Sequence, residues 1–449
     1  MTTRDLSALV EAREARIGVV GLGYVGLAAA VSIAAAGHRV TGVELRRERV
    51  DAVNAGTCPL DGDEPGLPET LADVVRQGRL RATGDPAALA GCDVVLVCVE
   101  TPVGDDHRPQ HQALLAACES LGRVLADGAL VVIESTVAPG TTTSLVRPLL
   151  ERTTGGAEGG RFHLGHCPER VMPGRLLHNM RAMDRVLGAC SPTGAAAMRA
   201  LYGSFVEGRL DDADTLTAEL VKTAENAYRD VSIAFANQLA LICERAGADV
   251  WRVRELVNRS PGRNVLLPGS GVGGHCIPKD PWLLASVLEE DATSSLLAAA
   301  RRLNDGMPAH CADLCAGLLV EHGVALDHAR VVVMGFSYLE DSDDTRGSPS
   351  AALVPRLEAL GCSVTVHDPF VPAHAGDVIE AVRGADCAVV MVAHRAYRQV
   401  ELDALAAVMR RPLLLDTRAV FEPAAMDRAG FAWRRLGVGG ERPVPSRVV

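Results

Sequence analysis

The segment Arg16-Ile-Gly-Val-Val-Gly21-Leu-Gly23-Tyr-Val-Gly26 is the clearest indication of the fold class of this chain. Its first six residues predict a buried strand, its glycines a tight turn, and the Ala-rich stretch after them a helix. A second predicted strand, His38-Arg-Val-Thr-Gly-Val-Glu44, ends in an acid. The glycines would serve a tight turn, close approach of the backbone to a pyrophosphate, and close packing of helix on strand. This order predicts a dinucleotide site with five contact residues: Gly21, Gly23, Tyr24, Val25 and Gly26.

The acid at the end of the second strand indicates which dinucleotide is bound. Glu44 would accept hydrogen bonds from the ribose hydroxyls and repel a 2′-phosphate, which favours NAD. NADP stays the alternative because three arginines follow closely: Arg46, Arg47 and Arg49.

Two further apolar runs predict strands that end beside the same cofactor. Residues 92–99 are followed by Glu100-Thr101-Pro102, and residues 129–133 by Glu134-Ser135-Thr136. Ligands of doubly wound sheets bind at the carboxyl ends of the strands. Thr101 and Thr136 are therefore predicted to touch the cofactor, and the alternative is that both are ordinary loop threonines.

The rest of the chain predicts a long helix and a second sheet. The pattern is helical from about residue 211 to 254, with Gly247 as the expected break. We expect an α/β protein with two doubly wound, Rossmann-like domains joined by a long central helix. The strands expected in the second domain are 329–335, 362–368, 386–392 and 412–418, and the expected parts of the chain are 1–208, 209–310, 311–437 and a tail, 438–449.

Composition excludes several classes of function. The net charge of −11 argues against nucleic acid as the main partner. No apolar run has the length of a membrane span, and residues 1–16 lack a signal-peptide pattern. The twelve cysteines show neither the spacing of a disulfide framework nor that of a zinc site. We therefore expect a reduced, cytoplasmic protein without a metal site.

Lysine is scarce, and the two lysines mark candidate sites. Among 45 Lys and Arg residues only Lys222 and Lys279 are lysines. Arg replaces Lys at little cost on a surface, but not where a compact, movable ammonium is required. Lys222 and Asn226 are four apart in the predicted helix, so they share a face and could donate to an anionic oxygen. The alternatives are a chance placement and an exposed polar pair.

Cys276 is the candidate nucleophile. It follows Gly271, Gly273 and Gly274, and such a glycine run lets backbone N–H groups face a phosphate or an oxyanion. If Cys276 opens a helix, the helix N-terminus and Lys279 would stabilise its thiolate. Asp280 would then be an acid or base within reach of the substrate. The alternatives are an inert buried cysteine and a capping or surface acid.

The motifs resemble those of the UDP-glucose/GDP-mannose dehydrogenase family over nearly the whole chain, from about residue 16 to 436. The shared motifs follow in the family's order: Gly21-Leu-Gly-Tyr-Val-Gly26, Ser135-Thr-Val-Ala-Pro-Gly-Thr141, Cys167-Pro-Glu-Arg-Val-Met-Pro-Gly174, Gly271-Val-Gly-Gly-His-Cys-Ile277 and Asn304-Asp-Gly-Met-Pro308. Together with Arg229-Asp-Val-Ser-Ile-Ala-Phe-Ala-Asn237, they look most like the UDP-N-acetylmannosamine dehydrogenase branch.

The resemblance implies a four-electron oxidation of the sugar C6 alcohol to a carboxylate, with two NAD consumed. Cys276 would form a thiohemiacetal with the C6 aldehyde and then a thioester, which water hydrolyses. The other catalytic roles that the resemblance implies are oxyanion stabilisation by Lys222 and Asn226, proton transfer by Asp280 with a water, thioester hydrolysis at Glu169, and a place near the reacting water for Thr136.

The resemblance also assigns binding residues and an oligomer. On the cofactor side it adds these to the glycine turn: Glu44, Arg49, Thr101, Pro102, Ser135, Thr136, Lys279 and Arg346. On the UDP-sugar side it implies Glu169, Arg170, Val171, Lys222, Asn226, Arg263, Gly271, Gly273, Gly274, Tyr338 and Arg418, the last reaching the neighbouring subunit's site. A homodimer through the central helix and a UDP-binding C-terminal domain follow from the same resemblance.

Two positions depart from the family pattern. Gly335-Phe-Ser-Tyr-Leu339 has Leu where the family has a substrate-gripping Lys, and Pro261-Gly262-Arg263-Asn264 carries its arginine one residue later than relatives do. Losing one charged contact would cost about 1.5–3 kcal/mol unless another group replaces it. Both changes concern the sugar nucleotide more than the reaction.

Four functions stay open from the sequence. The first is oxidation of UDP-N-acetylmannosamine or UDP-N-acetylglucosamine. The second is the same chemistry on UDP-glucose, GDP-mannose or an unusual nucleotide sugar of a specialised pathway. The third is a nucleotide-sugar-binding subunit without turnover, and the fourth is an alcohol dehydrogenase that stops at the aldehyde.

Overall fold

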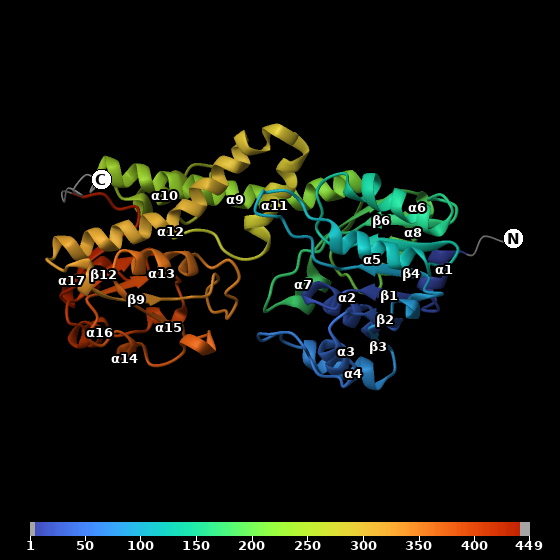
Figure 1. The fold of residues 1–449 in the computed structure, drawn as a ribbon, viewed down its shortest axis with the longest axis horizontal. Helices are drawn as coiled ribbons and strands as arrows, with labels where there is room; N and C mark the ends of the chain where they lie inside the picture. Colours follow the sequence, from blue (N-terminus) through green and yellow to red (C-terminus); the bar gives the residue numbers. More distant parts are fainter. Residues whose placement is uncertain (1–4, 441–449) are drawn as a thin grey trace. The chain divides into compact units, whose positions relative to one another are not determined.

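The computed structural model describes residues 5–440. Their contacts divide the chain into two compact units, each built around one sheet (Figure 1). Unit 1 comprises the residues up to 225 together with 282–289, and unit 2 comprises 226–281 and the residues from 290 onward. Both are α/β units with parallel-dominated sheets, so the predicted fold class is confirmed.

Unit 1 contains an eight-stranded sheet in the order β3-β2-β1-β4-β5-β6-β7-β8. All neighbours are parallel except β6 and β7, which are antiparallel. The strands are β1 (Arg16–Val20), β2 (Arg39–Val43), β3 (Leu80–Thr83), β4 (Val94–Val97), β5 (Ala129–Ile133), β6 (Phe162–His166), β7 (Arg185–Ala189) and β8 (Leu210–Ala213).

Helices cover both faces of this sheet. They are α1 (Leu6–Glu11), α2 (Tyr24–Ala35), α3 (Arg47–Asn54), α4 (Leu67–Arg76), α5 (Gln112–Gly122), α6 (Arg147–Thr154), α7 (Leu176–Ala182) and α8 (Pro192–Tyr202). Short helical turns lie at Pro86–Leu89 and, with π-helical bonding, at Thr142–Val146.

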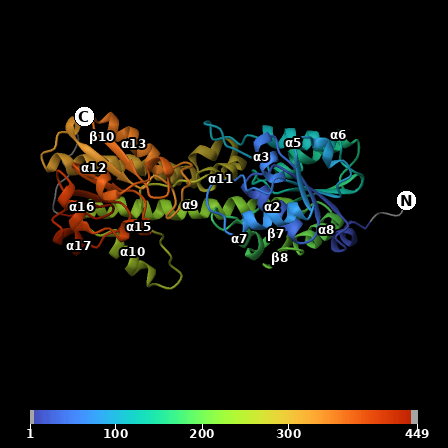
Figure 2. The same cartoon turned by 90° about the horizontal axis from the view of Figure 1, so that it is seen from below.

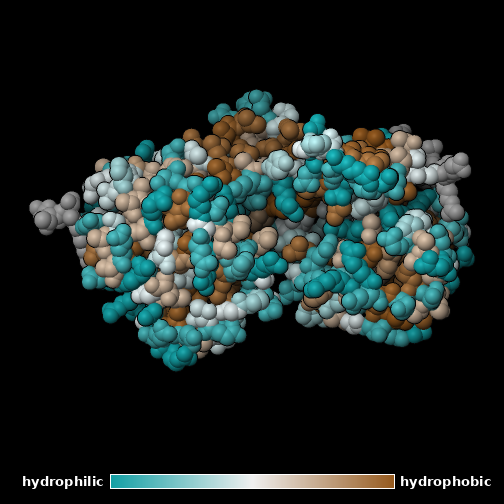
Figure 3. All heavy atoms as spheres, turned by 180° about the vertical axis from the view of Figure 1, so that it is seen from behind, coloured by the Kyte–Doolittle hydropathy of each residue, from teal (hydrophilic) through white to brown (hydrophobic). Residues whose placement is uncertain are grey.

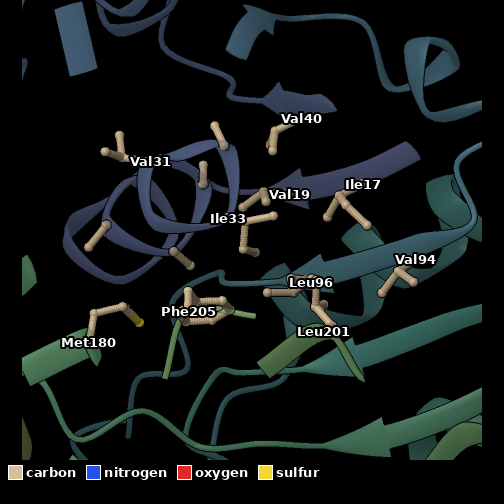
Figure 4. Close-up of a cluster of buried hydrophobic side chains, with 14 of the residues drawn as sticks. Ile17, Val19, Val31, Ile33, Val40, Val94, Leu96, Met180, Leu201 and Phe205 are labelled. Carbon is tan, nitrogen blue, oxygen red and sulfur yellow. The ribbon is translucent and has the colours of Figure 1, made fainter. Parts of the chain in front are cut away.

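Strand alternation explains the two layers of core in unit 1. Successive strand residues point to opposite faces. In β4, Val94 and Leu96 join the cluster under α2, while Val95 and Val97 join the cluster under α5 and α6. Figure 4 shows side chains of the cluster under α2. Within helix α2 itself, every residue from Gly26 to Ala34 is buried. Burying each large aliphatic side chain stabilises the fold by about 1.5–3 kcal/mol.

Unit 2 contains a five-stranded parallel sheet in the order β10-β9-β11-β12-β13. Its strands are β9 (Arg330–Met334), β10 (Ser363–His367), β11 (Cys387–Val390), β12 (Leu413–Asp416) and β13 (Ala432–Arg435). Its helices are α10 (Val250–Asn258), α12 (Leu296–Glu321), α13 (Pro349–Ala359), α14 (Val378–Ala381), α15 (Arg395–Arg398), α16 (Leu402–Val408) and α17 (Pro423–Arg428), with short turns at Leu326–His328 and Pro372–His374. A further short turn, Ser286–Ser294, begins in unit 1 and ends in unit 2.

Two helices run across the division between the units. Helix α9 (Thr215–Ala246) is one uninterrupted helix whose first residues belong to unit 1 and whose remainder belongs to unit 2 (Figure 2). Helix α11 (Cys276–Ala285) divides between Pro281 and Trp282. The predicted break at Gly247 is confirmed, because this glycine has a φ of 76° in the left-handed region, and α10 begins three residues later.

The strands that the sequence predicted are present, among them the run Phe162-His-Leu-Gly-His166 that forms β6, but four were missed. These are β3, β7, β8 and β13. β8 reads Leu-Asp-Asp-Ala and β13 reads Ala-Trp-Arg-Arg, so neither edge strand carries an apolar run. Of the expected tail, Val438 bridges to Asp249, and the Gly439 N–H donates to the Ala248 carbonyl at 2.8 Å. Residues 441–449 of that tail lie outside the described residues, and the four-part domain division stays a prediction.

Within residues 5–440, no helix is both long and apolar enough to cross a membrane.

Candidate active site

The glycine turn of unit 1 has the geometry of a dinucleotide cradle. Gly21 has a φ of 87°, and an added Cβ would lie 2.5 Å from the Cys98 carbonyl oxygen. A Cβ on Gly26 would lie 1.8 Å from the Gly21 carbonyl oxygen, so only glycine allows this packing. Gly23, by contrast, faces open space and forms the N-cap of α2. A pyrophosphate fits there, against the N-terminal N–H groups of α2 that include Tyr24 and Val25.

Glu44 lies directly beside this turn at the end of β2. Its carboxylate accepts hydrogen bonds from the N–H groups of Leu22 and Arg46, both at 3.0 Å, and pairs with Arg49 at 3.4 Å. Burial acts to raise the pKa of Glu44, but these donors outweigh it and lower the pKa overall. A carboxylate held charged at this place suits a ribose diol and disfavours a 2′-phosphate.

The turns after β4 and β5 meet, and the cofactor contact of Thr101 and Thr136 stays a prediction. The Thr101 hydroxyl donates to the Thr136 carbonyl, and the Ser135 hydroxyl donates to the Val99 carbonyl at 2.6 Å. Pro102 follows Thr101 and is half-buried. Glu219 of α9 was not indicated by any motif. Its carboxylate accepts from the N–H groups of Gly140 and Thr142 and so holds the turn after Thr136.

Glu169 and Lys222 form a buried ion pair in unit 1. Lys222 Nζ lies 3.6 Å from Glu169 Oε1, and the two side chains are only 7% and 9% exposed. Glu169 Oε2 also accepts from the Val171 N–H. Arg170 points elsewhere, because its guanidinium pairs with Glu225 and donates to the Asp184 carbonyl at 2.7 Å. The exposed-pair alternative for Lys222 is therefore wrong.

A polar cluster that the sequence did not signal lies under the Glu169 loop. Arg185, fully buried at the start of β7, donates to the Pro168 carbonyl at 3.4 Å. Glu134 accepts from the Tyr202 hydroxyl at 2.6 Å. Burial raises the pKa of Glu134 although Arg185 opposes the shift. Arg185 thereby holds the backbone directly before Glu169.

Cys276 is the first residue of α11, as expected for a thiol at a helix N-terminus. One turn later, Asp280 is fully buried and accepts from two side chains. Its Oδ1 lies 2.7 Å from Lys279 Nζ, and its Oδ2 accepts from the Asn226 amide. The alternative of a capping or surface acid is wrong for Asp280. Lys279 contacts this acid, and its predicted cofactor contact stays a prediction.

The glycines before Cys276 pack against the segment that carries Tyr338. A Cβ on Gly273 would lie 2.5 Å from the Tyr338 Cβ, and one on Gly274 would lie 2.9 Å from the Tyr338 ring. The Gly274 N–H donates to the Arg346 carbonyl at 2.8 Å, while the Arg346 guanidinium pairs with Asp344. Gly271 has a φ of 130° and approaches Pro308 closely. The loop is thereby fixed by close backbone contacts that larger residues would block.

The loop before Cys276 is held by two motifs, at residues 229–237 and 304–308, to which the resemblance assigned no role. Asn237 accepts from the Gly269 N–H at 2.8 Å and donates to Asn304 at 2.9 Å. Asn304 in turn donates to Asp230, which forms a buried ion pair with Arg301 at 2.6 Å. The sequence did not predict this network, because its residues lie far apart in the chain. Each of the three polar residues Asp230, Asn237 and Asn304 nevertheless belongs to one of the two motifs.

The two departures have local structural explanations. Ser260-Pro261-Gly262-Arg263 forms a turn closed by the Arg263 N–H and the Ser260 carbonyl, with Gly262 at a φ of 74°. Pro followed by a left-handed Gly is typical of a type II turn, which an arginine at residue 262 would strain. Arg263 is exposed and donates to the Pro261 carbonyl.

The side chain at the second departure is open to solvent. Leu339 is 43% exposed. Its neighbour Glu340 pairs with Arg418 at 3.3 Å, and Arg418 also packs against Gly269, where a Cβ would lie 2.5 Å from its guanidinium. Arg418 is thus a cation that lies near both Leu339 and the loop before Cys276.

Most other cysteines are inert. Burial raises the pKa of Cys92 and Cys190 to about 11 and of Cys118 and Cys167 to about 12. Within residues 5–440 the cysteines form no disulfide, and no group of His, Cys, Asp and Glu there could hold a metal ion. Cys276 differs in being half-buried at a helix start.

The glycine turn, Glu44 and the doubly wound sheet define an NAD-dependent dehydrogenase. Three family models match the chain: the NAD binding domain of the UDP-glucose/GDP-mannose dehydrogenase family at residues 15–206, its central domain at 216–306 and its UDP binding domain at 332–423.

Named relatives match nearly the whole chain. The UDP-N-acetyl-D-mannosamine dehydrogenase of Pyrococcus horikoshii is 38% identical over 94% of this chain and 99% of the relative. The NDP-N-acetyl-D-galactosaminuronic acid dehydrogenase of Ralstonia nicotianae is 36% identical over 90% and 96%. The solved structure of the Pyrococcus horikoshii UDP-D-ManNAc dehydrogenase matches with a TM-score of 0.89 and 37% identity, over 95% of this chain and 100% of that one.

The chain belongs to the UDP-glucose/GDP-mannose dehydrogenase family, and it is an NAD-dependent nucleotide-sugar dehydrogenase.

Proposed function

We propose that this enzyme oxidises the C6 alcohol of a UDP-N-acetylhexosamine, UDP-N-acetyl-D-mannosamine or UDP-N-acetyl-D-glucosamine, to the uronic acid. The observation that carries the proposal is the start of α11, where Cys276 precedes a buried Asp280 that is already bonded to Asn226 and Lys279. A thiol and a buried acid one turn apart in α11, with an amide of α9 bonded to that acid, suit covalent capture of an aldehyde.

In the first half of the proposed reaction, the C6 hydroxyl loses its proton to a water held by Asp280. When bound, NAD accepts a hydride in each of the two oxidation steps. The Cys276 thiolate then attacks the C6 carbonyl carbon and forms the carbon–sulfur bond of a thiohemiacetal. Lys222 and Asn226 donate to the resulting oxyanion, which a buried ammonium stabilises more strongly than a solvated one would.

In the second half, loss of the C6 hydride leaves a thioester on Cys276. A water attacks its carbonyl carbon, and Glu169 accepts a proton from that water while Thr136 helps to place it. The carbon–sulfur bond breaks, so the thiolate leaves and the carboxylate is formed. Because the aldehyde stays covalently bound between the two oxidations, it cannot escape into solvent.

The UDP end is assigned to unit 2 and the sugar to the loop residues. The proposed contacts of the nucleotide sugar are Tyr338, Arg170, Val171, Arg263 and the glycines at 271, 273 and 274. Arg346 is a proposed contact of the cofactor. Arg418, which pairs with Glu340 next to Leu339, is proposed to reach the substrate in the neighbouring subunit's site. The domain matching the family's UDP binding model supports this assignment.

The assignment of the sugar substrate rests on comparison with relatives. Relatives named for UDP-N-acetyl-D-mannosamine are 32% to 38% identical to this chain, which favours a UDP-N-acetylhexosamine. We expect NADH formation with UDP-N-acetyl-D-mannosamine or UDP-N-acetyl-D-glucosamine at least tenfold faster than with UDP-glucose or GDP-mannose, measured as kcat/KM at 340 nm. A preference for either of the last two would overturn the substrate assignment. NAD binding without turnover on any sugar would support a non-catalytic subunit.

A homodimer through α9 is part of the proposal, as is a cytoplasmic location. Tyr228, Phe235 and Ile242 are seven residues apart and 75%, 58% and 52% exposed, so they form an apolar stripe along one helix face. Other exposed apolar side chains lie at Val287, Leu288 and Leu296, and Figure 3 shows apolar surface at the top of the view, where the chain passes from α11 to α12.

Replacing Phe235 with aspartate should convert the dimer to a monomer, because an unpaired carboxylate would be buried in the α9 stripe. Light scattering coupled to gel filtration measures the change. The control is Arg229→Asp, which places the same carboxylate on another face of α9 and should leave the dimer intact. A Phe235→Asp protein with the same mass as the unchanged protein would contradict this interface.

A further inference from the structure

A buried histidine of unit 2, His394, lies against the loop of residues 336–341 that follows β9. This loop carries Tyr338, a proposed substrate contact, and Leu339, one of the two departures from the family pattern. His394 lies between β11 and α15, and its side chain is fully buried. Its two ring nitrogens have different partners, and the chemistry of each partner decides which atom donates.

The hydrogen bonds of His394 fix its protonation state. Nδ1 lies 2.9 Å from the Asp341 backbone nitrogen, which can only donate, so Nδ1 carries no proton. Nε2 lies 3.1 Å from Asp368 Oδ2 and 3.4 Å from the Ser337 hydroxyl oxygen. That hydroxyl gives its own proton to the Leu339 carbonyl at 2.8 Å. Nε2 is therefore the protonated nitrogen, and the imidazole is neutral.

Asp368, at the end of β10, holds the beginning of the same loop. It is fully buried, and its Oδ2 accepts from the N–H groups of Phe336 at 2.6 Å and Ser337 at 2.9 Å. Burial acts to raise the pKa of Asp368, but the bonds from His394 and from these N–H groups outweigh it and lower the pKa well below its usual range. The loop is thus tied at its beginning by Asp368 and at its end by His394.

The end of the loop has an uncommon backbone conformation. Asp341 has a φ of 54°, in the left-handed region that residues other than glycine seldom adopt. Its carboxylate accepts from the Arg395 N–H at 2.9 Å and from the Arg395 guanidinium at 2.5 Å. These bonds hold the side chain, whereas His394 Nδ1 holds the backbone N–H and with it the direction of the chain.

Between the two ties, the loop packs on the glycines of the candidate site. A Cβ on Gly273 would lie 2.5 Å from the Tyr338 Cβ, and one on Gly274 would lie 2.9 Å from the Tyr338 ring. Glu340 of the same loop pairs with Arg418 at 3.3 Å. All of these residues belong to unit 2, so the contacts lie within one compact unit.

We propose that His394 is a positioning residue for the UDP-sugar: its neutral imidazole fixes the 336–341 loop in the conformation that holds Tyr338 in the substrate site. A loop that is already ordered binds its ligand without the cost of ordering it. The inference rests on the proposed function, because it takes Tyr338 as a substrate contact.

Two variants separate the two bonds of His394. In His394→Gln the amide nitrogen takes the place of Nε2, so the donor to Asp368 is kept and the acceptor for Asp341 is lost. In His394→Asn the amide oxygen takes the place of Nδ1, so the acceptor is kept, and Asp368 still has its backbone donors. His328→Gln is the matched control, because His328 is 81% exposed on a short helical turn of unit 2.

The readouts do not require turnover. Calorimetry gives the Kd for UDP, the part that the candidate UDP-sugars share, and fluorescence titration gives the Kd for NADH. Hydrogen exchange with mass spectrometry follows the peptide that contains residues 336–344, and the melting temperature reports on the fold as a whole.

We expect His394→Gln to raise the Kd for UDP about tenfold, because the loop must then be ordered on binding. The loop peptide should exchange at least about tenfold faster in this variant. Its Kd for NADH should stay within about twofold, since the glycine turn and Glu44 lie in unit 1. His394→Asn should keep the Kd for UDP within about threefold. His328→Gln should match the unchanged enzyme throughout.

The result that overturns this inference differs from the one that overturns the proposed function. A His394→Gln protein with unchanged UDP affinity would overturn the inference, as would a His394→Asn protein impaired as much as His394→Gln. Equal weakening of UDP and NADH binding would do the same, because it would indicate a general loss of structure. If the unchanged enzyme binds UDP but oxidises no UDP-sugar, the proposed function fails, while weaker UDP binding in His394→Gln alone still supports the role of His394.

Discussion

Replacing Cys276 with alanine is expected to abolish formation of the sugar acid while NAD still binds. The thiol is the only proposed covalent partner of the C6 aldehyde, so no thioester can form without it. We expect acid formation to fall by a factor of at least ~10⁴, in line with the loss of a catalytic nucleophile. Chromatography of the UDP-sugar products measures the acid, and fluorescence titration with NADH measures binding.

The control for this prediction is Cys58→Ala, because Cys58 is also half-buried but lies in unit 1 outside the candidate site. It should keep full activity. Cys276→Ser tests the same point more finely, since a single-step alcohol dehydrogenase would be unaffected by it, whereas our mechanism requires loss of the second oxidation. A normal acid yield from Cys276→Ala would eliminate the thioester mechanism.

Replacing Lys222 with methionine should lower kcat by ~10²–10³ with a small change in KM, because one donor to the oxyanion is lost. Arginine should not rescue it, although its charge is the same. Lys222 is buried against Glu169 and is only 7% exposed, so a larger planar guanidinium does not fit. We therefore expect Lys222→Arg to lose at least about tenfold in kcat.

Folding must be separated from chemistry in this experiment. Lys222→Met leaves Glu169 as a buried carboxylate without its ammonium, which could cost about 3–5 kcal/mol of stability. The double variant Lys222→Met, Glu169→Gln removes both charges and should regain thermal stability, which is its only readout because Glu169→Gln also removes the proposed proton acceptor. Full activity in Lys222→Arg would contradict the requirement for a compact ammonium. An unchanged melting temperature in Lys222→Met together with a lowered kcat would assign the effect to chemistry.

The local signals in the sequence were enough for the central elements of the fold. β1, β2 and α2 follow from apolar runs and from the glycine motif, in which Gly21 and Gly26 leave no room for a Cβ. The edge strands β8 and β13 could not be predicted in this way, because polar residues fill them and their pairing with neighbours defines them. Gly247 was predictable because a left-handed residue ends a helix by its own backbone.

The candidate site was predictable where chemistry restricts the residue type. Lysine scarcity identified Lys222 and Lys279, and the structure places both beside buried carboxylates, Glu169 and Asp280. The supporting contacts were not predictable. Asn237 reaches Gly269, and His394 reaches Asp341, across long stretches of chain, and neither spacing nor composition indicates such pairs. Tertiary packing alone brings them together.

The most direct test of the proposed chemistry is the number of NADH formed per UDP-sugar converted to acid, measured with limiting UDP-N-acetyl-D-mannosamine or UDP-N-acetyl-D-glucosamine in excess NAD. The proposed mechanism predicts two NADH for each uronic acid, with no free aldehyde in a trapping assay. One NADH per sugar, with aldehyde recovered, would contradict the covalent role of Cys276.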